Sequence, residues 1–302
     1  MRNPSKPLIS IIIPTYNHSR YLGRALQSIH DQTYKNWEII IIDNHSTDNT
    51  FDVVKKFDGP RVNYMKIHND GIIAASRNMG INAAKGNWLA FLDSDDWWSF
   101  DKLEICSKYI DKDLDLIHHD LDLVYDHPNF FRRRLTRSRQ LKSPMLTDLL
   151  IKGNAIVNST VIVRKKLVNK IGGISEDKNM VASEDYNTWL RIAAITDRFK
   201  YIPKSLGFYQ IHSSSISRRD MSESDYAAIA EFKDQLTPNQ LCEVEKQLSY
   251  ISGRFNYLQK EYASAELALK KAFPSRNIII TFKTLSMLAI IALTKSYEFT
   301  KK

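Results

Sequence analysis

Acidic side chains follow a predicted buried strand at the point where that strand ends. The apolar run 88–92 leads directly into Asp93, Ser94, Asp95 and Asp96. Carboxylates this close together repel one another, which is costly beside an apolar strand unless a cation or a fixed set of donors offsets the repulsion. A hard divalent ion that also binds diphosphate oxygens would offset it. The pattern therefore predicts a metal and nucleotide site, because an acidic turn capping the next helix would explain only Asp95 or Asp96.

Asp43 occupies the same kind of position at the end of another apolar run, 39–42. The residues after it are polar, and Ser46 and Asp48 suit the capping of a following helix. Asp43 suits capping less well, because it lies on the strand tip rather than at the helix start. Ligands of open α/β sheets bind outside the carboxyl ends of the strands. Asp43 therefore lies where such a ligand would bind.

A third acidic pair, Glu184 and Asp185, begins the amphipathic segment 184–195. A helix N-terminus stabilises negative charge, so helix capping explains the pair on spacing alone. Acid–base chemistry is the alternative.

Short apolar runs alternate with helical periodicity over residues 8–92, which is typical of βαβ units and a parallel sheet. The strand runs are almost entirely apolar, as expected when both faces of a sheet are buried. We expect strands at 8–13, 38–42, 62–66 and 88–92, and helices at 20–30 and 47–57. Beyond residue 93 we expect strands at 114–125 and 156–163, helices at 146–151 and 184–195, two strands around Pro203 within 199–212, and a polar loop at 213–220.

From about residue 223 the composition becomes helical, and the last apolar run covers 278–293. This run contains Lys283 and is shorter than the roughly 20 residues that span a bilayer. It either packs on the protein or lies at a membrane interface. Nearby lysines, including Lys295, favour contact with anionic lipid.

The composition limits the classes of partner. The chain has 302 residues, 43% of them hydrophobic, which suffices for one large α/β domain and an appendage. The net charge is +9, and the segment 131–142 is basic without any acid, which indicates either a solvated face or contact with an anionic lipid or lipid diphosphate. This basic segment has no nucleic-acid recognition motif beside it, so we do not expect a nucleic-acid partner.

The two cysteines, Cys106 and Cys242, lack the spacing of a disulfide framework or a zinc site, which fits a reducing compartment. The apolar run near the N-terminus is predicted to be a strand rather than a signal peptide. We therefore expect a cytoplasmic protein.

Four stretches together resemble the family-two glycosyltransferases, of the type that builds bacterial surface polysaccharides such as O-antigen and capsule. They are residues 9–17 (ISIIIPTYN), 38–50, 74–96 and 183–191 (SEDYNTWLR). The resemblance implies a GT-A fold, an α/β fold with a Rossmann-like, mostly parallel sheet flanked by helices and a C-terminal helical appendage. The implied boundaries are a GT-A domain at 1–220, with a nucleotide-sugar-binding half (1–96) and an acceptor half (97–220), and a helical region at 221–302 that could associate with a membrane.

The resemblance also implies roles for individual residues. The residues that would contact the base and ribose of the donor are Pro14, Thr15, Tyr16, Asn17, Asp43, Asn44 and Arg77. After the predicted strand at 88–92, Asp93 would contact the ribose, Ser94 would lie beside the donor, Asp95 would bind the metal, and Asp96 would face the sugar or acceptor. Arg218 or Arg219 would bind the diphosphate. Asp185 would be the catalytic base with Glu184 as its neighbour, and His212 would approach the metal, Mn²⁺ or Mg²⁺. Asn44 and His45 depart from the family pattern, which usually has a second acid and a glycine there. Asn and His tolerate positive φ better than most residues.

The implied reaction is an inverting, metal-dependent transfer from a nucleotide-sugar donor, a UDP-hexose or UDP-N-acetylhexosamine, to a saccharide acceptor on a lipid diphosphate. The enzyme would lie at the inner face of the cytoplasmic membrane. A non-catalytic protein, which either binds a sugar nucleotide or acts as a scaffold, is one alternative. A nucleotidyltransferase is another, but residues 14–20 contain no glycine, whereas that class is expected to have a glycine-rich phosphate loop near its N-terminus.

Overall fold

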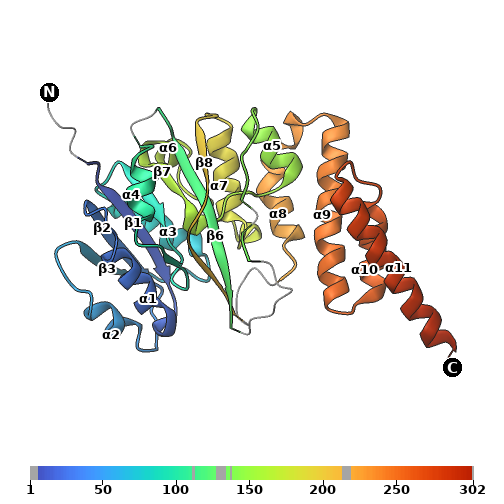
Figure 1. The fold of residues 1–302 in the computed structure, drawn as a ribbon, viewed down its shortest axis with the longest axis horizontal. Helices are drawn as coiled ribbons and strands as arrows, with labels where there is room; N and C mark the ends of the chain where they lie inside the picture. Colours follow the sequence, from blue (N-terminus) through green and yellow to red (C-terminus); the bar gives the residue numbers. More distant parts are fainter. Residues whose placement is uncertain (1–5, 111–112, 127–133, 137, 213–218, 301–302) are drawn as a thin grey trace.

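A single mixed sheet runs through the computed structural model, which describes residues 6–110, 113–126, 134–136, 138–212 and 219–300 (Figure 1). Within these residues the sheet has eight strands in the order β3-β2-β1-β4-β7-β6-β8-β5. The strands are β1 (Ile9–Thr15), β2 (Trp37–Asp43), β3 (Val62–Lys66), β4 (Trp88–Phe91), β5 (Trp97–Trp98), β6 (Leu116–Tyr125), β7 (Ile162–Arg164) and β8 (Phe199–Ile211). The mixed sheet and its flanking helices confirm the predicted α/β fold class.

The first four strands are parallel, as the sequence predicts, and their carboxyl ends lie at one edge. Thr15 at the end of β1 pairs with Asp43 at the end of β2. On the other side of β1, Ile12 pairs with Phe91 of β4, and the chain then continues into Asp93. The acids that follow β2 and β4 therefore emerge at the same edge of the sheet.

Helices cover both faces of this sheet, so both faces are buried. The helices of this part are α1 (Ser19–His30), α2 (Thr50–Lys55), α3 (Ile73–Ala83), α4 (Lys102–Ser107), α5 (Met145–Lys152), α6 (Lys165–Lys170) and α7 (Glu184–Ala193). Side chains alternate between the faces of a strand: Ile11 of β1 packs in the core under α1 and α4, whereas Ile12 packs in the core under α3 and α7.

Beyond residue 96 the structure has elements that were not predicted, β5, α4 and α6, and it differs from the predicted strands in two places. The predicted strand at 156–163 is mostly a turn, with a short 3₁₀ helix η1 (Asn158–Thr160), because Val161 N donates back to Asn158 O at 3.1 Å. The two strands predicted around Pro203 are one strand, β8. Its pairing with β6 shifts from His119–Ile202 to Asp120–Ser205, so Pro203, which has no N–H to donate, lies at an irregularity of the ladder.

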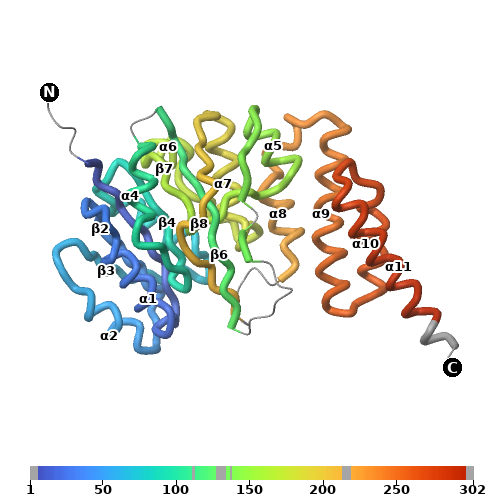
Figure 2. Tube along the Cα trace, in the orientation of Figure 1, coloured from blue at the N-terminus to red at the C-terminus, as the bar shows by residue number. Residues whose placement is uncertain are grey.

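The C-terminal region is helical, as predicted, and comprises α8 (Ser222–Ile229), η4 (Ala230–Gln235), α9 (Pro238–Leu258), α10 (Tyr262–Ala272) and α11 (Ile278–Thr300). Ile229 of α8 and Val244 of α9 belong to the core that contains α7. A separate cluster that includes Leu269 and Ile291 holds α9, α10 and α11 together. Figures 1 and 2 show these three helices at the end of the molecule opposite β3 and α2.

Candidate active site

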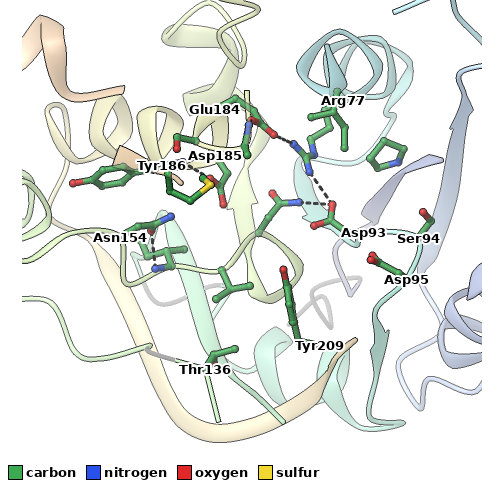
Figure 3. Close-up of a pocket in the computed structure, with 18 of the residues that line it drawn as sticks. Arg77, Asp93, Ser94, Asp95, Thr136, Asn154, Glu184, Asp185, Tyr186 and Tyr209 are labelled. Atoms are coloured by element: carbon green, nitrogen blue, oxygen red, sulfur yellow. Dashed lines mark hydrogen bonds and ion pairs between the residues drawn. The ribbon is translucent and has the colours of Figure 1, made fainter. Parts of the chain in front are cut away.

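A cavity of about 590 Å³ lies at the carboxyl ends of β1 and β4 (Figure 3). Its volume is within the range of small-molecule sites in proteins. The predicted site residues that line it are Pro14, Arg77, Asp93, Ser94, Asp95, Glu184, Asp185 and His212. The structure thus brings together residues from three of the four sequence stretches and from the end of β8.

Arg77 joins the two acidic parts of the cavity. Its guanidinium donates to Asp93 at 2.8 Å and to Glu184 at 2.5 Å. Burial alone would lower the pKa of Arg77, but the two carboxylates raise it above its ordinary value, so the side chain stays charged. Gly80 allows α3 to approach the sheet closely, because an added Cβ would lie 2.7 Å from side-chain carbons of Ile12 and Ile42. This approach sets the position of Arg77 on the same helix.

Asp95 and His212 are the two residues expected at the metal, and they are neighbours. Nε2 of His212 lies 2.9 Å from Oδ2 of Asp95. Adjacent ligands of an octahedral ion with bonds of about 2.1 Å lie about 3.0 Å apart, so this pair fits one edge of such a shell. In the described part of the chain, no three His, Cys, Asp or Glu side chains converge as a metal cluster. The remaining ligands would therefore have to be diphosphate oxygens and water, which suits Mg²⁺ or Mn²⁺.

Asp96 does not line the cavity, although the family resemblance implies a place for it at the sugar or acceptor. It is buried beneath the cavity, where it accepts from Ser159 Oγ at 2.5 Å and from Gln210 N at 3.1 Å. Burial, followed by the charges of Asp95 and Asp93, raises the pKa of Asp96 well above its ordinary value. A cation is therefore not needed for all three carboxylates after β4, because Ser159 and Gln210 donate hydrogen bonds to Asp96.

Asp185 lines the cavity beside Glu184, and Figure 3 shows it across the cavity from Asp95. Burial raises its pKa to about 8, the negative charge of Glu184 adds to the rise, and Arg77 opposes it. A carboxylate with a pKa near the working pH is suited to general-base chemistry. In the first turn of α7, Asp185 Oδ1 also accepts from Tyr186 N at 2.6 Å, whereas the N-cap residue Ser183 makes no capping bond with its side chain.

The residues expected at the donor base and ribose form a cluster next to the cavity, and among them Pro14 and Arg77 line it. Asp43 is buried and accepts from Ser46 Oγ at 2.6 Å and from Tyr64 OH at 2.5 Å. Asn17 accepts from Thr47 N at 2.8 Å, which ties the loop after β1 to the loop after β2. Asn44 N donates to Thr15 O at 3.0 Å, and Thr15 is buried, whereas Tyr16 is 54% exposed.

The departure from the family pattern at His45 has a structural counterpart. His45 has φ of 52°, in the left-handed region that the usual glycine would adopt easily. Its ring stacks on that of His68 with centroids 3.7 Å apart. The backbone turn is therefore kept without glycine.

Several residues of the cavity were not predicted. His18 contacts Ser94 Oγ through Nδ1 at 2.7 Å, and Asn158 donates to Asp93 at 3.0 Å. Asp225 of α8 lines the cavity and accepts from Ser183 Oγ at 2.7 Å; burial raises its pKa to about 6. His18 directly follows the first matching stretch and could have been noticed, but Asn158 and Asp225 carry no local signal. Arg218 lies outside the described residues, and Arg219, also considered for the diphosphate, is exposed.

Comparison with known proteins identifies the fold and the family of this chain. WfaP of Escherichia coli, a UDP-Glc:alpha-D-GlcNAc-diphosphoundecaprenol beta-1,3-glucosyltransferase, is 30% identical over 219 residues, covering 72% of this chain and 82% of WfaP. TarS of S. aureus in complex with UDP-GlcNAc superposes with a TM-score of 0.59 at 18% identity, over 87% of this chain and 88% of that chain. This chain spans half (50%) of a longer TarS chain that also matches, with a TM-score of 0.63 and 18% identity over 90% of this chain.

The mannosyltransferase PcManGT from Pyrobaculum calidifontis, in complex with GDP-Man and Mn²⁺, has a TM-score of 0.62 at 18% identity, over 98% of this chain and 83% of that chain. These similarities confirm the predicted GT-A fold. The sequence profile of glycosyl transferase family 2 matches residues 10–172, and since this is more than half of the sequence, the chain belongs to that family.

Proposed function

We propose that this enzyme transfers a hexose or N-acetylhexosamine from a UDP-sugar to a saccharide acceptor, with inversion at the anomeric carbon. The observation that carries the proposal is the arrangement of one cavity, with Asp95 on one side and Asp185 on the other (Figure 3). His212 lies on the Asp95 side, 2.9 Å from that carboxylate. This arrangement separates a place for the leaving diphosphate from a place for the attacking hydroxyl. A displacement in a single step needs that separation.

The donor side would hold the nucleotide diphosphate. Pro14 and the adjacent residues around Asp43 would bind the base and ribose. Asp93 would accept a hydrogen bond from a ribose hydroxyl, and the bond from Arg77 holds the Asp93 carboxylate in place. Asp95 and His212 would hold Mn²⁺ or Mg²⁺, which when bound supplies positive charge to the diphosphate oxygens. Nε2 of His212 and Oδ2 of Asp95 lie 2.9 Å apart, so the two side chains converge on one place.

The acceptor side would activate the incoming hydroxyl. Asp185 would take the proton from that hydroxyl as its oxygen forms the new bond to the anomeric carbon, and the bond to the diphosphate breaks on the opposite face. Glu184 positions this region through its bond to Arg77. General-base assistance of this kind contributes about 100- to 10,000-fold to the rate.

The names of relatives support a lipid-linked acceptor. WfaP is named for transfer to a GlcNAc-diphosphoundecaprenol, and TuaG of Bacillus subtilis, named for teichuronic acid biosynthesis, is 40% identical over 101 residues, or 33% of this chain. We propose a saccharide on a lipid diphosphate as the acceptor, and surface polysaccharide biosynthesis at the inner face of the cytoplasmic membrane as the setting.

A donor screen tests the proposal. The purified protein is incubated with UDP-, GDP- and dTDP-sugars, with and without Mn²⁺, while thermal shift and nucleotide release are recorded. A ligand at 100 times its dissociation constant should stabilise the fold by about 2.7 kcal/mol. Manganese-dependent stabilisation by one UDP-sugar, with slow UDP release that a saccharide acceptor accelerates, is the expected result. A folded protein that responds to no nucleotide would favour the scaffold alternative.

A further inference from the structure

Helix α11 presents large apolar side chains to solvent along one side. Ile278, Ile279, Phe282, Leu285, Ile290 and Leu293 are between 46% and 77% exposed. The segment 278–296 has a mean hydropathy of 1.8 and only 17% of it is buried, so it would pass a length and composition test for a membrane-crossing helix. A contiguous apolar surface of this kind on a soluble domain marks an interaction site.

The opposite side of α11 is packed on the protein. Thr284 and Ile291 are buried, and Ile291 packs with Leu269 of α10 in the cluster that holds the last three helices together. Lys295 also forms an ion pair with Glu266 of α10. The helix is thus held along its length, and Figures 1 and 2 show it running across α9 and α10 at the end of the molecule.

This attachment excludes a spanning orientation for the docked helix. If α11 crossed a bilayer in its present position, α10 would follow it, and the Glu266 and Lys270 charges would enter the hydrocarbon region. Charged side chains and the polar helix ends of α10 are costly there. A helix that is packed on one side and apolar on the other is suited to lie in the plane of the interface.

The charges near the apolar face favour anionic lipid as its partner. The segment 278–296 contains Lys283 and Lys295 and no acidic residue, and Arg276 precedes it. Lys283 is exposed within the apolar surface itself. A symmetric pairing of two copies through this face would remove the Lys283 ammonium group of each copy from water within an apolar contact. At a membrane the same side chain extends to a phosphate headgroup.

We propose that α11 docks in the plane of an anionic lipid bilayer, with Phe282, Leu293 and their exposed apolar neighbours inserted at the headgroup boundary. The partner is therefore a lipid surface rather than a second copy of the chain. This inference rests on the proposed function in one respect: a lipid-linked acceptor would explain why the enzyme binds a membrane.

Vesicle co-sedimentation tests the proposal. The purified full chain is mixed with vesicles of phosphatidylglycerol and phosphatidylcholine, or of phosphatidylcholine alone. The wild-type protein should sediment with the anionic vesicles, and less with the neutral ones. The double variant Phe282→Asp/Leu293→Asp should lose vesicle affinity by at least about tenfold, because charges at these positions would have to enter the apolar layer. Both side chains are exposed in the folded protein, at 72% and 71%, so the variant should fold normally.

Phe100→Asp is the matched control, since Phe100 is 64% exposed and lies before α4, outside the C-terminal helices. It should leave vesicle binding unchanged. Wild-type protein that stays in the supernatant with anionic vesicles would overturn the proposal, as would a lipid-free dimer that the double variant dissociates. UDP-sugar turnover with a water-soluble acceptor is measured on the same samples. Turnover without vesicle binding would refute only the docking, whereas vesicle binding without any nucleotide response would refute only the proposed reaction.

Discussion

Arg77 donates a 2.5 Å hydrogen bond to Glu184, a residue 107 positions later in the chain. Both side chains are nearly buried, with exposures of 4% and 6%. The other terminal nitrogen of the same guanidinium donates to Asp93. One buried cation therefore links the acids after β4 to the acids that begin α7. This link couples the predicted donor side to the predicted base side.

Arg77→Met tests the link. It would leave Asp93 and Glu184 without their cation, and breaking a buried ion pair by removing one partner typically costs about 3–5 kcal/mol. We expect the urea midpoint of the variant to fall accordingly, together with a loss of sugar transfer. Arg77→Lys keeps the positive charge, but an ammonium group cannot donate to both carboxylates with the planar geometry of a guanidinium. Its urea midpoint and its activity should therefore lie between those of the wild type and of Arg77→Met. An Arg77→Met protein with the wild-type urea midpoint would contradict this account.

The raised pKa of Asp185 predicts a pH dependence of activity. A base with a pKa of about 8 is mostly protonated at neutral pH, so kcat/KM should rise with pH and level off above about 8. Asp185→Asn should bind the UDP-sugar normally and lose about 100-fold or more in turnover. A rate profile that is flat between pH 6 and 9 in the wild type, or near-normal turnover of the variant, would exclude Asp185 as the base.

The same residue predicts a change in stability. The folded pKa lies above the ordinary value, so between about pH 4 and 8 the folded state binds more protons than the unfolded state. This carboxyl group therefore contributes a loss of stability as the pH rises through that window. Asp185→Asn should remove this loss. The urea midpoint of the variant minus that of the wild type should therefore be larger at pH 8 than at pH 5. Equal differences at the two pH values would contradict the raised pKa.

Asp95 and Asp96 provide a matched pair for testing the metal site. Asp95→Asn should abolish the Mn²⁺-dependent part of UDP binding in calorimetry, because Asp95 faces the cavity beside His212. Asp96→Asn should retain it, because Asp96 lies beneath the cavity with Ser159 and Gln210. UDP binding without metal serves as the internal reference. Loss of the metal dependence in Asp96→Asn but not in Asp95→Asn would reverse the assignment.

The parts of the site that could be predicted from the sequence are those with a local signal. Apolar runs predict β1 to β4, and acids directly after a run predict Asp43 and Asp93 at the sheet edge. The helix α3 was not predicted as a separate element, because residues 73–83 contain Asn78 and Gly80, both poor helix formers. Its packing on the sheet outweighs that propensity.

The remaining parts depend on contacts between distant residues. Asp96 could not be separated from Asp95 by sequence, because its donors come from η1 and β8. Asp225 reaches the cavity because α8 packs against α7, so a residue assigned to the C-terminal helical region contributes to the site. Such roles are properties of tertiary packing and have no spacing that a sequence motif would reveal.

Lys102 is a buried cation outside the active site, and it predicts a stabilising substitution. Its side chain is fully buried, its Nζ lies 3.3 Å from the centre of the Trp98 ring, and this nitrogen has no hydrogen-bond partner among the described residues. Burial lowers the pKa of Lys102 to about 7, below the value of about 10.4 in an unfolded chain.

Between pH 7 and about 10.4 the unfolded state binds more protons than the folded state, so this residue makes the stability of the fold rise with pH. Lys102→Met should therefore stabilise the protein by about 1–4 kcal/mol at pH 7 or below, because replacing a buried charge with an apolar side chain of similar volume removes its desolvation cost. The gain in urea midpoint should shrink as the pH approaches 10, and a substitution that destabilises the protein at pH 6 would show that the amine is satisfied in the fold.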